Sequence, residues 1–128
     1  MADIVKEYSH GCRIVREQRD DGPDRYHYEN PMGRVKSFEN PGKARLYADV
    51  QDVTGGFREA KTGERGVPPA VARAREDVLM AYLVSNETMG IEWVARFYDT
   101  EEDIIRDYVE IVQNRAAEQR SDEEGDDE

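Results

Sequence analysis

The chain has one cysteine, only four lysines and no long apolar run. A single cysteine, Cys12, excludes a disulfide framework and a zinc site built from several cysteines. A helix needs about 20 consecutive apolar residues to span a bilayer, and no stretch of this chain approaches that length. The first ten residues also lack the basic start and apolar stretch of a signal peptide. These absences predict a cytoplasmic protein with no membrane contact.

Negative charge, in contrast, is abundant. The 128 residues include 29 acidic and 18 basic side chains, which gives a net charge of −11. Hydrophobic residues are 38% of the chain, and 7 Tyr, 3 Phe and 1 Trp are among them. That is enough for a small core, so a fully disordered chain is excluded. The length corresponds to one domain.

The charge is unevenly distributed. Residues 1–75 hold 14 basic and 12 acidic side chains, a net of +2, whereas residues 76–128 hold 4 basic and 17 acidic ones, a net of −13. Residues 121–128 contain six acids and no apolar side chain, so they cannot bury surface to offset the entropy of ordering. We expect a disordered acidic tail there, which keeps the protein soluble or, alternatively, contacts a basic partner.

The basic residues are 14 arginines and 4 lysines. Many acids, few lysines and few aliphatic residues together resemble the proteins of salt-loving archaea. At about 1 M salt the Debye length is near 3 Å, so repulsion within an acidic chain is largely screened. In such a salt-adapted protein an acidic composition does not exclude nucleic acid as a partner.

The first 54 residues predict a β-β-β-α unit. Clusters of Asp, Gly, Asn and Pro mark turns between short segments of β-branched and aromatic residues. The expected strands cover residues 10–19, 25–29 and 34–38, in an antiparallel meander. Asn40 and Pro41 have the types preferred at the N-cap and first residue of a helix. That helix should end near Thr54, at Gly55 and Gly56.

The remainder predicts a helical half. Residues 55–67 are rich in glycine without periodicity, which indicates a flexible loop. Apolar residues at helical spacing then follow through residues 68–120. The expected helices cover residues 68–85, 91–98 and 100–117. The predicted class is therefore α+β: a three-stranded antiparallel sheet with a helix, a helical half, and the acidic tail.

The last two expected helices contain the most informative pattern, within residues 90–112. Ala95 is a small residue in the first of them, and Ile105 and Tyr108 follow ten and thirteen positions later. Apolar residues flank the alanine at Ile91, Val94 and Tyr98. This pattern resembles the helix-turn-helix superfamily, in which a small residue lets two helices cross closely and presents the second to the DNA major groove. The resemblance implies a DNA-binding transcription regulator acting as a homodimer.

Two features depart from that family. Asp99 occupies the turn position where the family usually has glycine. The start of the second helix bears acids at residues 101–103, which repel phosphates and accept hydrogen bonds only from cytosine amino groups. In this half, Arg96 and Arg106 are the cations that would contact DNA.

The expected sheet offers a rival surface for nucleic acid. Arg13, Arg34 and Lys36 are cationic residues of its strands and could contact phosphates and bases. Glu17 and Glu29 interrupt this patch. Alternating Arg and Glu is also typical of a solvated sheet face with cross-strand ion pairs.

Catalytic patterns are weak. Cys12 with His10 or His27 lacks any surrounding signature of a nucleophile or metal site, and the glycine pairs lack the Lys-Ser/Thr of a phosphate loop. We expect Trp93 and the tyrosines in the core. The sequence therefore predicts a non-enzymatic DNA-binding protein without cofactor or metal. The alternative is an acidic, antitoxin-like adaptor that binds a basic protein partner.

Overall fold

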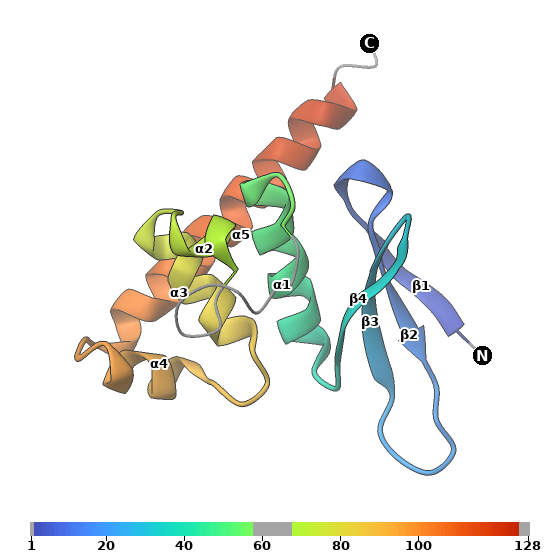
Figure 1. Ribbon diagram of the computed structural model, residues 1–128, viewed down its shortest axis with the longest axis horizontal. Helices are drawn as coiled ribbons and strands as arrows, with labels where there is room; N and C mark the ends of the chain where they lie inside the picture. The colour runs from blue at the N-terminus through green and yellow to red at the C-terminus, as the bar shows by residue number, and fades with distance from the viewer. Residues whose placement is uncertain (1, 58–67, 126–128) are drawn as a thin grey trace.

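The computed structural model describes residues 2–57 and 68–125. In this part the chain forms a four-stranded antiparallel sheet and a group of helices, so the α+β class is confirmed (Figure 1). The strands are β1 (Ala2–Glu7), β2 (Arg13–Glu17), β3 (Arg25–Asn30) and β4 (Gly33–Phe38). The helices are the 3-10 helix η1 (Ser9–Gly11) and α1 (Pro41–Thr54), α2 (Pro69–Ala72), α3 (Glu76–Ser85), α4 (Ile91–Phe97) and α5 (Glu102–Gly125).

The sheet has the order β1-β2-β3-β4, the expected meander with one strand more than the three predicted. The additional strand, β1, pairs antiparallel with β2 along the sheet edge. Its Ile4 is 54% exposed, and three of the six residues of β1, Asp3, Lys6 and Glu7, are charged. An edge strand of this kind buries little surface, so it lacks the apolar alternation by which a strand is recognised.

One face of the sheet packs against α1. Ile14 and Tyr28 lie opposite each other in the register and are both buried, as the period-two pattern predicts. The Tyr47 ring of α1 packs at 5.4 Å from those of Tyr28 and Phe38. We call this the inner face, and the opposite face, which no helix covers in Figure 1, the outer face.

Helix α1 begins and ends where its local signals predict. The Asn40 side chain accepts hydrogen bonds from the backbone N–H groups of Gly42 and Lys43, at 2.8 and 3.2 Å. At the other end Gly55 adopts a left-handed conformation with φ of 78°. In Figure 1, α1 stands between the sheet and the remaining helices, so it contributes to both sides of the core.

The helical half differs from the prediction at several boundaries. Helices α2 and α3 replace the single helix expected over 68–85, although no proline or glycine marks the break at 73–75. Helix α5 continues to Gly125, so residues 121–125 are helical and not disordered. The last three residues of the expected tail lie outside the described residues, as does 58–67 of the expected loop. No helix within 2–57 and 68–125 has the length and apolar character to cross a membrane.

Candidate functional site

The turn between α4 and α5 packs as the alanine pattern predicts. Ala95 is 3% exposed, and Ile105 on the next helix is fully buried. Asp99 has a φ of 52°, a left-handed conformation that Asp tolerates better than most residues. The Thr100 N–H then donates to the Ala95 carbonyl at 2.9 Å and closes the turn. Asp99 therefore does what a glycine would do at this position.

The first turn of α5 is acidic, and Arg106, which follows it, is already paired with these acids. The helix begins at Glu102, two residues after the expected start. Carboxylates here interact favourably with the positive end of the helix. Arg106 contacts Glu102 and Asp103, each at 3.2 Å. The cation that was predicted to contact DNA thus lies among carboxylates of its own helix.

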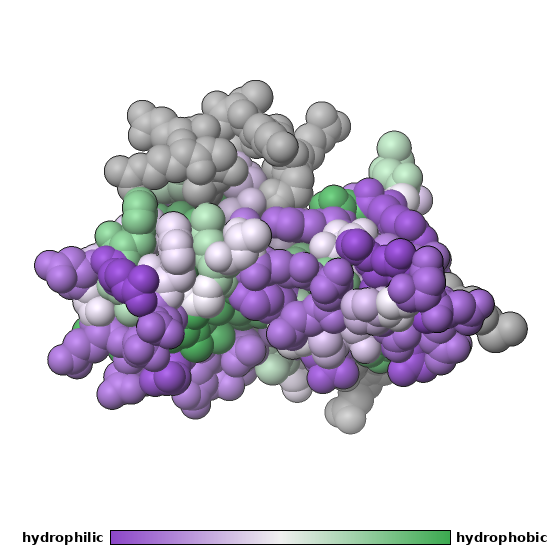
Figure 2. All heavy atoms as spheres, turned by 90° about the horizontal axis from the view of Figure 1, so that it is seen from below, coloured by the Kyte–Doolittle hydropathy of each residue, from purple (hydrophilic) through white to green (hydrophobic). Residues whose placement is uncertain are grey.

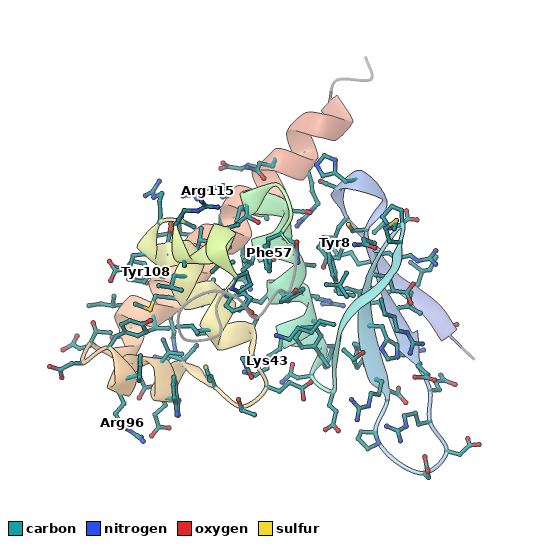
Figure 3. All side chains as sticks on the ribbon, in the orientation of Figure 1. Tyr8, Lys43, Phe57, Arg96, Tyr108 and Arg115 are labelled. Carbon is teal, nitrogen blue, oxygen red and sulfur yellow. The ribbon has the colours of Figure 1, made fainter. Side chains whose placement is uncertain are left out.

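Arg96, the second predicted DNA contact in this half, has a similar position on α4. It pairs with Glu92 one turn earlier, at 3.1 Å. Figure 3 shows the Arg96 side chain pointing away from the rest of the molecule. A shallow, open hollow of about 670 Å³ lies between α4 and the start of α5, and both arginines line it. Its other charged lining residues are Glu92, Glu101, Glu102 and Asp103, so the hollow has an excess of two negative charges.

Helix α4, whose Glu92 and Arg96 line this hollow, also exposes a stacked aromatic pair. Trp93 is 39% and Phe97 54% exposed, and their rings are parallel to within 10° at a centroid distance of 5.1 Å. The ring centroids of Phe97 and Tyr98 lie 5.0 Å apart in a T-shaped arrangement. The prediction of a buried Trp93 is therefore wrong. Five of the seven residues of α4 are apolar, but only Val94 and Ala95 are buried. This excess of apolar residues in a short helix was the sequence signal that some of them would be exposed.

Figure 2 shows this part of the surface from below. On the helical half, apolar and near-neutral residues gather between hydrophilic ones, whereas the sheet half is mostly hydrophilic. Exposed apolar side chains also occur on α5, where Ile104 is 39% and Ile111 45% exposed. The surface formed by the exposed side chains of α4 and the first turn of α5 is hereafter the α4–α5 surface.

The three cations predicted in the sheet do not lie together. The Lys36 ammonium lies on the inner face, 5.2 Å from the Tyr47 ring centroid and 5.5 Å from that of Tyr82. Arg13 and Arg34 lie on the outer face, where both contact Glu29. Arg34 and Lys36 are two residues apart and would share a face in a regular strand, but a bulge in β4 turns them to opposite faces.

A second, smaller pocket lies near Cys12. It has a volume of about 160 Å³ and includes His10, Cys12, Tyr28 and Asp52. Burial, with a hydrogen bond to Cys12, raises the pKa of Tyr28 far above its usual value, so this hydroxyl gives up its proton less readily than an ordinary tyrosine. Within the described ranges no group of three His, Cys, Asp or Glu side chains is placed to hold a metal ion.

No protein-family model, curated protein or solved structure matches the chain. The functional argument therefore depends on the surfaces described above.

Proposed function

We propose that this chain is a non-enzymatic adaptor whose α4–α5 surface binds a basic segment of a partner protein. The observation that supports this most directly is the exposed Trp93–Phe97 stack on α4, the helix that also lines a hollow with excess negative charge. Exposed aromatic residues are typical of the centre of protein interfaces, where they bury much area at little cost in conformational entropy. An antitoxin-like adaptor is an example of this class.

The charge of the hollow favours a basic occupant over a second copy of this chain. Two copies would bring the acids at 101–103 together, and like charges across an interface oppose binding. A segment with arginine or lysine beside apolar residues complements both the carboxylates and the aromatic pair. In concentrated salt the ionic contribution weakens, so the aromatic contact would supply more of the affinity.

Trp93 is the only tryptophan in the chain and so reports directly on this surface. The test is a fluorescence titration with an arginine-rich amphipathic peptide, at about 0.1 M and about 2 M KCl. We expect Trp93 emission to shift to shorter wavelength as the indole is covered. An acidic peptide of equal length is the ligand control. An equal response to both peptides, or none to the basic one, would refute the proposal.

Matched variants locate the binding surface. Glu101→Gln/Glu102→Gln should weaken peptide binding about tenfold at low salt, because two facing charges are removed. Glu110→Gln/Glu118→Gln removes the same charge from exposed positions farther along α5 and should leave binding unchanged. Phe97→Ala should weaken binding at both salt concentrations, since its contribution is apolar.

DNA binding by the same two helices, in the manner of a helix-turn-helix protein, is a second candidate. It is supported by the buried Ala95, the left-handed Asp99 and the exposure of Ile104 on the second helix. Retention on duplex DNA at low KCl, lost in molar KCl and in Arg96→Gln/Arg106→Gln, would favour this regulatory role. No retention under either condition would favour the adaptor.

A further inference from the structure

Arg13, Glu29 and Arg34 lie side by side on three neighbouring strands of the outer face. Glu29 is directly opposite Arg13 in the β2–β3 register and directly opposite Arg34 in the β3–β4 register. Side chains in such positions have Cβ atoms about 5 Å apart and project from the same face. The three residues are 16 and 5 positions apart in sequence, yet adjacent in the sheet.

Glu29 contacts the Nε atom of both arginines, one with each carboxylate oxygen. Arg13 Nε lies 3.3 Å from Glu29 Oε1, and Arg34 Nε lies 3.6 Å from Glu29 Oε2. The Glu29 side chain is 18% exposed, whereas those of Arg13 and Arg34 are 49% and 56% exposed. The carboxylate is thus less exposed than the two guanidinium groups that contact it. Glu17, on the same face, hydrogen-bonds His27 and interacts electrostatically with Arg34.

The bulge in β4 creates this arrangement. Tyr28 pairs with Lys36, but the next residue, Glu29, pairs with Arg34, so Val35 is the extra residue. Val35 packs against the core, and in a regular ladder it would stand opposite Glu29 in place of Arg34. Bulges commonly redirect side chains in this way at functional positions.

We propose that Arg13 and Arg34 form a binding site for a phosphate group on the outer face of the sheet. Two guanidinium groups share the Glu29 carboxylate, while Glu17 on the same face hydrogen-bonds His27. Each guanidinium has a planar pair of terminal N–H groups suited to phosphate oxygens. The phosphate belongs to a nucleic acid backbone or to a small phosphate compound. This site is on the sheet and is independent of the α4–α5 surface.

The test measures binding of a labelled oligothymidylate to the full chain, with inorganic phosphate in a separate titration followed by the Nε–H NMR signals of Arg13 and Arg34. Oligoglutamate serves as a polyanion without phosphate. We expect Arg13→Gln/Arg34→Gln to weaken oligonucleotide binding at least about tenfold. The slope of log K against log salt should become shallower by about 1.4, that is about 0.7 for each lost phosphate contact on a single strand.

Arg75→Gln is the matched control, since Arg75 is a 77% exposed arginine that contacts one carboxylate, Asp77, and lies on neither the sheet nor the α4–α5 surface. Arg13→Lys/Arg34→Lys keeps the charge while removing the planar geometry, and should bind the oligonucleotide more weakly than wild type does. This variant carries the test if the glutamine variant fails to fold. Oligonucleotide binding lost in the double variant supports a nucleic acid backbone. A response of both Nε–H signals to inorganic phosphate alone supports a small phosphate compound. No response to either probe, equal binding of oligoglutamate, or wild-type binding by both double variants would overturn the site.

Discussion

Lys43 shows how one side chain supports the α4–α5 surface from a distance. Its Nζ donates to the carbonyls of Val84, Asn86 and Met89, at 2.7, 2.8 and 2.7 Å. These acceptors belong to the end of α3 and the segment that leads into α4. Burial lowers the pKa of Lys43, and the nearby Glu87 opposes this by favouring the charged form. One ammonium from α1 therefore orders the connection that positions α4 (Figure 3).

Replacing Lys43 with methionine should lower the free energy of unfolding by about 2 kcal/mol, because three partly buried carbonyls lose a charged donor. Urea denaturation followed by circular dichroism measures this change. Lys6→Met is the control, since Lys6 is exposed and lies over the Tyr8 ring. A loss for Lys43→Met no larger than for Lys6→Met would show that the three hydrogen bonds contribute little.

Between elements, the contact of α4 with α5 depends on the size of Ala95. The side chain is 3% exposed, and Val94 beside it is fully buried. A larger side chain here must displace α5, since buried contacts of this kind leave no space for added carbons.

We expect Ala95→Leu to destabilise the fold by about 2 kcal/mol and to change the emission of Trp93, which lies on the same helix. Ala117→Leu adds the same atoms at an exposed position of α5 and should change stability by less than about 0.5 kcal/mol. Thermal denaturation and the emission spectrum measure both effects. Equal stability of the two variants would mean that the helices do not cross tightly at Ala95.

Arg120 links the two ends of the chain to the middle. Its Nη1 contacts Asp49 and Asp52 of α1, each at 2.9 Å, and its guanidinium lies 5.0 Å from the Tyr8 ring centroid. The three charged side chains are 17%, 9% and 4% exposed. Burial raises the pKa of Asp49, although Arg120 acts in the opposite direction. The contacts of Arg120 therefore join α5 to α1 and to Tyr8, which follows β1, and solvent screens these charges little.

Arg120→Met should cost about 3 kcal/mol at neutral pH, because two buried carboxylates lose their cation. The pKa of Asp49 then rises further. A carboxyl with a raised folded pKa contributes stability below its unfolded pKa, about 4, and loses it as pH rises through the folded pKa. We therefore expect the variant to lose less unfolding free energy, relative to wild type, at about pH 4 than at about pH 7.

Urea midpoints at the two pH values measure this difference. Arg106→Met is the matched control, an arginine that also contacts two carboxylates but is 56% exposed. Its effect should be small and nearly independent of pH. If the loss of unfolding free energy in Arg120→Met does not change with pH, the role of Asp49 is contradicted.

Local signals predicted the features that depend on a few neighbouring residues. The Asn40 cap and the Gly55 end follow from hydrogen bonding and backbone conformation within one turn, and both were correct. The burial of Ala95 was implied by the resemblance of residues 90–112 to the helix-turn-helix pattern.

Other features required contacts between residues distant in sequence. Strand β1 forms because β2 offers a pairing edge, and the bulge in β4 places Lys36 over Tyr47 while turning Arg34 outward. Trp93 is exposed because α4 packs on one side only. The sequence shows which charges and rings are present, whereas packing alone establishes which of them reach solvent, since each side chain's environment depends on several elements at once.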